Sequence, residues 1–236
     1  MEIGRRLATW RTGKAPAGMA AGAGAGTAIF GLMGLLIAFT FSAADSRFDQ
    51  RRQLIVQEVN AIGTAYLRLE ILPARSQPHL RKLFREYVDA RIDSYRQVPD
   101  IDLENTRSAR VASLQREIWA EAVAASGEAS SPAVMTLILQ SLNEMVDITT
   151  TRSAATRMHA PSIILVMLGL LVLTCAMLAG HDMAASPKRS WSHIFGFAIL
   201  MTLAVYVILD LEYPRVGLIR VDPLDRMLVD LRRSMD

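Results

Sequence analysis

The chain has 236 residues, of which 51% are hydrophobic and 21% are charged, and its mean hydropathy is +0.24. Such a chain is too apolar for an ordinary soluble protein and too charged to lie wholly within a membrane. Residues 45–160 carry 15 basic and 15 acidic side chains, so this part lacks the clustered basic surface that nucleic-acid binding needs. The single cysteine, Cys175, lies in an apolar run, which excludes an intrachain disulfide and a cysteine-based metal site.

A first membrane span is predicted at residues 20–44, after a basic amino-terminal segment at residues 1–19. No charged residue lies between Lys14 and Asp45, and residues 27–44 are strongly apolar. At a rise of about 1.5 Å per residue, this run is long enough to cross a bilayer. It is too long for the core of a signal peptide, and no small-residue cleavage site follows, so we expect an uncleaved span.

Small residues recur at intervals of four along this span, which favours close approach of a second helix. Ala- and Gly-rich composition is also ordinary in membrane helices, so self-association is the preferred interpretation and coincidence the alternative. Aromatic and hydroxyl side chains on the same span are suited to a pore constriction, although contact with lipid or a neighbouring helix is the commoner role for any one of them. The candidate pore or packing residues are Gly22, Gly26, Phe30, Gly34, Ala38 and Phe39.

A helical extramembrane domain is predicted at residues 45–160. Apolar residues recur at helical spacing from Ile55 to Leu69, and no proline lies between Pro16 and Pro73, so the first span and this domain are expected to share one long helix. Three further amphipathic helices are expected, beginning near residues 78, 103 and 133. The intervening residues 45–52 form a charged collar whose arginines are expected to reach lipid headgroups.

Two groups of polar residues in this domain invite a functional interpretation. Asn60, Thr64 and Arg68 form a polar row at i, i+4 spacing, suited to a partner helix or a pore vestibule, but ordinary hydrogen bonding between helices is preferred. Glu58 lies close to this row and receives the same interpretation. A second group could suggest a metal or acid–base site, but solvated residues that pair with neighbours one turn away explain it better. This group comprises Asn143, Glu144, Asp147, Arg152 and His159.

Two further spans are predicted at residues 161–180 and 192–210, joined by a loop at residues 181–191. The first of them is uncharged and begins with Pro161, and the second is flanked by Trp191 and Tyr213 as interfacial anchors. The spans contain no acidic or basic residue before Asp210, which argues against an intramembrane proton relay. In the tail, residues 211–236, three leucines at helical spacing are expected to dock on the helical domain.

The chain contains none of the common local signatures of enzymes or nucleotide-binding proteins. G-x-S-x-G, the P-loop, G-x-G-x-x-G and H-E-x-x-H are all missing from the sequence. We therefore expect no enzymatic activity, no cofactor and no catalytic or metal-binding residue.

Four ordered stretches resemble the bacterial bestrophin-like-domain membrane proteins. They are EVNAIGTAYLRLEILPA (58–74), FREYVDARI (84–92), LNEMVDITTTR (142–152) and DLEYPRVGLIRV (210–221). The resemblance implies a helical membrane protein distantly similar to bestrophin anion channels, in a family without an established activity. Its members usually begin with an additional span, and EIGRR (2–6) resembles the stretch just after it. Either the start codon is misassigned or this member has three spans in place of four.

Together these observations predict an all-α integral membrane protein with about three spans and an inserted helical-bundle domain. We expect a multi-pass protein of the bacterial inner membrane. The positive-inside rule, with eight basic residues near the spans on the side of the domain and tail against six on the other, favours a cytoplasmic domain. The preferred function is an oligomeric anion channel, whose partners are the lipid bilayer, copies of itself and small anions, but not nucleic acid. The alternative is a non-conducting scaffold or signalling protein that binds a partner through its helical domain.

Overall fold

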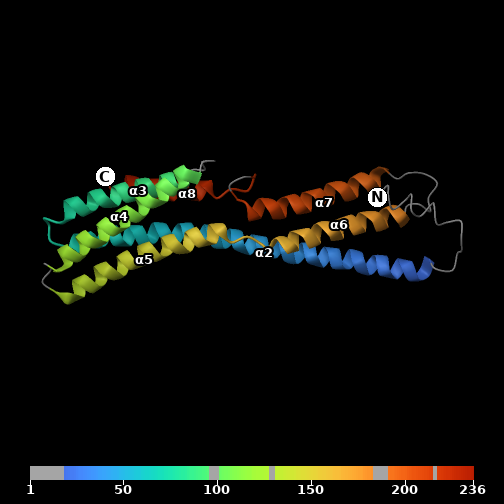
Figure 1. The fold of residues 1–236 in the computed structure, drawn as a ribbon, viewed down its shortest axis with the longest axis horizontal. Helices are drawn as coiled ribbons and strands as arrows, with labels where there is room; N and C mark the ends of the chain where they lie inside the picture. Colours follow the sequence, from blue (N-terminus) through green and yellow to red (C-terminus); the bar gives the residue numbers. More distant parts are fainter. Residues whose placement is uncertain (1–18, 96–100, 128–130, 183–190, 215–216) are drawn as a thin grey trace. The chain divides into compact units, whose positions relative to one another are not determined.

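The computed structural model describes residues 19–95, 101–127, 131–182, 191–214 and 217–236, and every regular element in these ranges is helical (Figure 1). The all-α prediction is confirmed for this part of the chain. The basic residues of the amino-terminal segment and most of the loop at 181–191 lie outside the described residues. The elements are α2 (Met19–Arg68), the 3₁₀ helix η1 (Leu69–Ile71), α3 (Gln77–Tyr95), α4 (Ile101–Gly127), α5 (Pro132–Arg157), α6 (Ser162–Asp182), α7 (Trp191–Glu212) and α8 (Asp222–Arg233).

The long helix α2 contributes to both compact units into which the described chain divides. The first, here called the span unit, contains α2 up to Phe48 together with His159–Tyr213, and the second, the helical domain, contains Asp49–Met158 and Pro214–Asp236. The 50 residues of α2 form one helix because no proline removes a backbone donor within it. The expectation that the apolar run and the polar domain share one helix is therefore confirmed.

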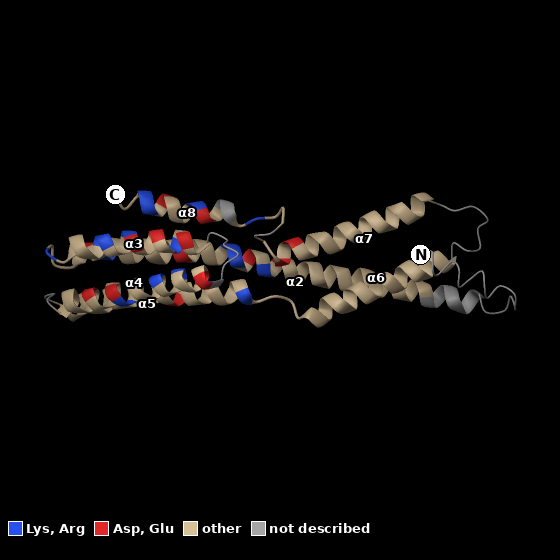
Figure 2. Ribbon diagram, turned by 45° about the horizontal axis from the view of Figure 1, so that its top comes forward, with Lys and Arg blue, Asp and Glu red and all other residues tan. Residues whose placement is uncertain are grey.

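By length and composition, three stretches of the described chain contain a helix able to cross a membrane: Gly26–Ile71, Pro132–His181 and Trp191–Glu212. Figure 2 marks acidic and basic residues on the ribbons of α3, α4, α5 and α8, whereas α6 and α7 carry almost none. Within the span unit, Phe30 of α2 packs edge-on against Phe197 of α7, with ring centroids 6.4 Å apart. The Cys175 thiol of α6 lies 4.0 Å from the Ile29 carbonyl oxygen.

The helical domain has one hydrophobic core, to which α2, α3, α4, α5 and α8 contribute. The amphipathic helix expected to begin near residue 103 is confirmed, because apolar residues of α4 at spacings of three and four are all buried: Val111, Leu114, Ile118, Ala122 and Ala125. The predicted docking of the tail is also confirmed. Leu228 of α8 is fully buried in this core, and the Tyr66 hydroxyl of α2 donates a hydrogen bond to the Met235 carbonyl oxygen at 3.0 Å.

The charged collar differs from its prediction at Arg51. Its side chain does not extend to solvent or headgroups but is 6% exposed, and its guanidinium donates to the Ala155 and Met158 carbonyl oxygens at 3.2 and 2.7 Å. The last carbonyls of a helix lack partners within the helix, so Arg51 satisfies the carboxyl end of α5. Sequence position alone could not show that α5 ends beside this residue.

Candidate functional site

One side of α2 is left uncovered by the rest of the described chain. Its residues recur at an average interval close to the 3.6 residues of a helical turn, so they share one side of the helix, which we call the open face. All of them are exposed: Leu35, Phe39, Ser42, Ser46, Asp49, Gln53, Gln57, Asn60, Thr64 and Leu67.

The chemistry of the open face changes along its length. In the predicted span it presents Leu35 and Phe39, which are 52% and 65% exposed. Two serines follow. The part that belongs to the helical domain presents side-chain amides, Thr64 and finally the apolar Leu67, and Asp49 is the one charged residue of the face. An uncharged polar surface suits contact with water, whereas a short apolar segment suits a constriction. The open face is therefore the best candidate surface for a conduction path.

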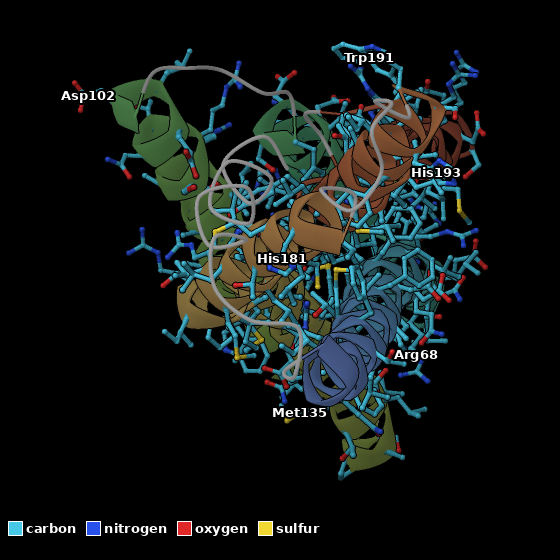
Figure 3. All side chains as sticks on the ribbon, turned by 90° about the vertical axis from the view of Figure 1, so that its right-hand side faces the viewer. Arg68, Asp102, Met135, His181, Trp191 and His193 are labelled. Carbon is cyan, nitrogen blue, oxygen red and sulfur yellow. The ribbon has the colours of Figure 1, made fainter. Side chains whose placement is uncertain are left out.

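The structure separates the members of the predicted polar row. Asn60 and Thr64 lie on the open face, but Arg68, labelled in Figure 3, donates from Nη1 to the Leu137 carbonyl oxygen of α5 at 2.9 Å. The interpretation as interhelical hydrogen bonding is confirmed for Arg68. For Asn60 and Thr64, a vestibule lining remains a prediction.

The candidate packing residues of the first span occupy different surroundings. Gly26 is buried, whereas Gly34 and Ala38 are exposed, and the surroundings of Gly22 lie outside the described residues. A Cβ atom added at Gly26 or Gly34 would meet no atom within 4 Å. Space for an approaching helix therefore exists at the exposed Gly34, and the packing role of these residues stays a prediction.

A cluster of charged residues is buried in the helical domain on the inward side of α2. Glu58 is fully buried, and its carboxylate accepts from Arg91 Nε at 2.6 Å, from Arg152 Nη1 at 2.5 Å and from the Tyr95 hydroxyl at 2.8 Å. Arg152 Nη2 also reaches Asp225 Oδ1 at 2.5 Å. We call these five residues the Glu58 cluster. It ties together α2, α3, α5 and α8.

Tyr95 supports the cluster with its ring as well as its hydroxyl. The guanidinium carbons of Arg152 and Arg91 lie 3.5 and 4.7 Å from the centre of the Tyr95 ring, distances at which a cation is attracted to an aromatic face. Two guanidinium groups thus share one buried carboxylate and one ring. Such groups tolerate burial only because each is paired and hydrogen-bonded.

The prediction that Arg152 is a solvated residue was wrong, since its side chain is 3% exposed. Arginine side chains are rarely buried, so Arg152 was expected to face solvent. A stronger signal was present: Glu58, Arg91 and Arg152 each continue the buried stripe of their own helix. Glu58 and Arg91 lie one turn beyond Ile55 and Tyr87, and Arg152 lies two turns beyond Met145. One acid and two bases on inward stripes indicate a buried ion cluster.

The other residues of the group predicted together with Arg152 do not lie together in the structure. Asn143 donates to Asp147 Oδ2 at 3.3 Å on the exposed side of α5, which confirms the expected i, i+4 pair. His159 belongs to the span unit, where its Nδ1 lies 3.8 Å from the buried Glu212 carboxylate and its ring stacks on Tyr213. Among the described residues, no three His, Cys, Asp or Glu side chains gather as metal ligands.

Glu212, at the end of α7, organises a second buried ionic contact. Its carboxylate lies 2.9 Å from Arg47 Nη2 of α2 and also accepts from the Ala160 backbone amide. These contacts connect α2, α7 and the segment before α6 within the span unit.

Tyr87 lies beside the Glu58 cluster and is almost fully buried. Its hydroxyl is 3.0 Å from the Thr149 hydroxyl and accepts from the Gln115 amide at 3.3 Å. Burial raises the pKa of Tyr87 above its usual 10.0, against the opposing field of Arg91, because the phenolate is poorly solvated there. Tyr87 is therefore neutral at physiological pH.

Comparison with known proteins identifies a similar family and similar folds. The family model described as Bestrophin-like domain matches residues 24–225. A bacterial bestrophin homologue from Klebsiella pneumoniae matches with a TM-score of 0.69 and 17% identity over 98% of this chain and 95% of that one. A point variant of a bacterial bestrophin homologue from Klebsiella pneumoniae matches with a TM-score of 0.71 and 16% identity. The match covers 90% of this chain and 85% of that one. A structure described as a membrane protein matches with a TM-score of 0.72 and 16% identity, over 99% of this chain and 92% of that one. No curated protein matches the chain.

Proposed function

The chain belongs to the bestrophin-like family, and on that premise we propose that it forms an oligomeric membrane channel for small anions. The observation that carries the proposal is the open face of α2. It runs without interruption from the apolar run of the span unit into the polar helical domain, and no other described part of the chain covers it.

The polar half of the open face restricts what it can contact. Gln53, Gln57, Asn60 and Thr64 are unsuited to lipid, and each is exposed. In a ring of copies with this face turned to the axis, these side chains line a wide aqueous vestibule. Phe39 then lines the narrow apolar section, which conducts only when it is wide enough to hold water. Exposed apolar residues on α6 and α7 remain available for lipid.

The preference for anions rests on the family's likeness to bestrophins rather than on a ring of bases. Asp49, the acid of the open face, is paired with Arg52, whose Nη1 lies 3.1 Å from Asp49 Oδ1. This pairing reduces the attraction that the carboxylate would exert on cations. The spans also lack basic residues that would trap a permeating anion.

We further propose that the helical domain and tail lie in the cytoplasm of a bacterium, as the distribution of basic residues favours. A fluorescent reporter fused after Asp236 should then be fluorescent. Activity of a periplasm-dependent reporter at the same site would reverse the orientation.

Chloride release from liposomes tests the channel. Liposomes containing the protein should release chloride faster than empty ones, and Phe39→Ala should raise the rate because it widens the apolar section. Phe41→Ala is the matched control: Phe41 is also exposed and in the same span, but it lies off the open face, so its truncation should leave the rate unchanged. A potassium gradient in place of the chloride gradient should give slower release.

If wild type and both variants retain chloride while folded and oligomeric, the channel is refuted. The scaffold alternative would then apply. The next measurement would be whether a protein co-purifies through residues 45–157.

A further inference from the structure

A polar cavity lies in the helical domain between α3, α4 and α5. Its volume is about 590 Å³, which is within the range of about 300–1,000 Å³ typical of small-molecule sites. No described residue of α2 lines it, so the cavity is separate from the open face. Figure 1 shows α3, α4 and α5 side by side in this domain.

Arginines outnumber acidic residues among the described residues that line the cavity. Arg107 of α4 and Arg157 of α5 line it, and Glu104 is the one acid among the described lining residues. Arg91 lines it as well, but its charge is balanced by the buried carboxylate of Glu58. Guanidinium groups at a partly enclosed polar site recognise oxyanions through paired hydrogen bonds.

The wall formed by α5 is rich in hydroxyl groups with a defined polarity. Ser153 donates its proton to the Thr149 carbonyl oxygen at 2.9 Å, and Thr156 donates to the Ser153 carbonyl oxygen at 2.8 Å. Thr150 makes the same kind of bond to Val146 at 3.4 Å. Because each hydroxyl has only one proton, these oxygens present acceptor lone pairs to the cavity. This wall is suited to a ligand that donates hydrogen bonds.

We propose that the cavity binds a small phosphate ester that carries free hydroxyl groups. Arg107 and Arg157 hold the phosphate, and the α5 hydroxyl oxygens accept from the hydroxyl groups of the ligand. This chemistry is shared by soluble glycerol 3-phosphate and by the headgroup of phosphatidylglycerol. Arg157 precedes Ser162, where α6 begins, by five residues, so a lipid source is tested beside a soluble one. The site does not depend on conduction.

Equilibrium dialysis of the detergent-solubilised full chain against labelled glycerol 3-phosphate tests the proposal. We expect saturable binding at about one molecule per chain, with inorganic phosphate weaker because it lacks the hydroxyl groups. Arg107→Gln and Arg157→Gln should each weaken binding about tenfold, as expected for loss of a charge-assisted hydrogen bond. Ser153→Ala should weaken glycerol 3-phosphate but not inorganic phosphate.

Arg116→Gln is the matched control, since Arg116 is an exposed arginine of α4 that does not line the cavity. It should leave binding unchanged. Helical content measured by circular dichroism confirms that every variant is folded, so that loss of binding reports on the cavity.

Nanodiscs separate the two sources of the ligand. If the source is lipid, nanodiscs of phosphatidylglycerol should raise the melting temperature above that in phosphatidylcholine, and the Arg107→Gln, Arg157→Gln double variant should lose the increase. If the source is soluble, glycerol 3-phosphate should give this arginine-dependent increase in phosphatidylcholine nanodiscs. The proposal is overturned if neither ligand binds saturably, or if the double variant binds as tightly as the wild type.

Discussion

The burial of the Glu58 cluster determines how much stability the protein is expected to lose when one of its charges is removed. Glu58→Gln keeps the shape of the side chain but removes the negative charge shared by Arg91 and Arg152, both of which are nearly buried. Arg152 retains Asp225, whereas Arg91 keeps no carboxylate of the cluster. Removing one partner of a buried ion pair typically costs about 3–5 kcal/mol, because the remaining charge is left desolvated and uncompensated.

An exposed pair in the same domain provides the comparison. Glu70 lies 3.3 Å from Arg81 Nη2, but the two side chains are 66% and 28% exposed. Exposed pairs contribute about 0–1 kcal/mol. For a chain of this size, about 1 kcal/mol corresponds to about 2–4 °C in melting temperature. Glu58→Gln should therefore lower the melting temperature by roughly 6–20 °C, and Glu70→Gln by less than about 4 °C.

The assay is thermal unfolding of the purified protein followed by circular dichroism at 222 nm, the standard helical band, in one detergent and buffer. A double variant adds a test of coupling: Glu58→Gln with Arg91→Met should be less destabilised than the sum of the two single variants, because no uncompensated arginine remains at position 91. If Glu58→Gln and Glu70→Gln melt within a few degrees of each other, the cluster does not stabilise the domain as reasoned.

Two further changes test the packing of the first span and the burial of Tyr87. Gly34 and Gly169 are both exposed glycines at which an added Cβ has open space. Gly34→Leu should shift the solubilised protein to lower mass because the larger side chain blocks helix packing, whereas the control Gly169→Leu, in α6, should not. An unchanged mass distribution for Gly34→Leu would show that the small-residue stripe faces lipid. The raised pKa of Tyr87 predicts that its contribution to stability is complete below pH 10.0 and decreases as pH rises above that value, because the unfolded chain loses the proton first. Tyr87→Phe should therefore give a shallower loss of melting temperature between pH 10 and 11 than the wild type, and equal slopes would contradict the burial of the hydroxyl.

Local patterns were sufficient for the helices and for much of the core. The apolar stripe from Ile55 to Leu69 and the lack of proline predicted one helix that enters a polar domain, and α2 confirms it. The periodicity of α4 and of the tail likewise predicted which side chains are buried. These predictions succeed because helix periodicity and the hydrophobic effect act over a few turns of one segment.

The partners of the buried charges required the tertiary structure. Sequence reasoning placed Arg51 at the membrane surface and Arg152 in solvent, whereas Arg51 satisfies carbonyls of α5 and Arg152 pairs with Glu58, 94 positions away along the chain. Whether a charged side chain is buried depends on an opposite charge contributed by another helix, and the spacing within one helix contains no information about it.

For the open face and the polar cavity too, the sequence identifies the residue types, and the tertiary structure decides which of them share a surface. The sequence determined that α2 is amphipathic and which of its residues are polar, but only the packing of the other helices decided which side of it stays uncovered. Arg107 and Arg157 are 50 positions apart and on different helices, so no local motif joins them. Their shared cavity exists because α3, α4 and α5 pack together, and that arrangement follows from the summed burial of many side chains rather than from the pattern of any one segment.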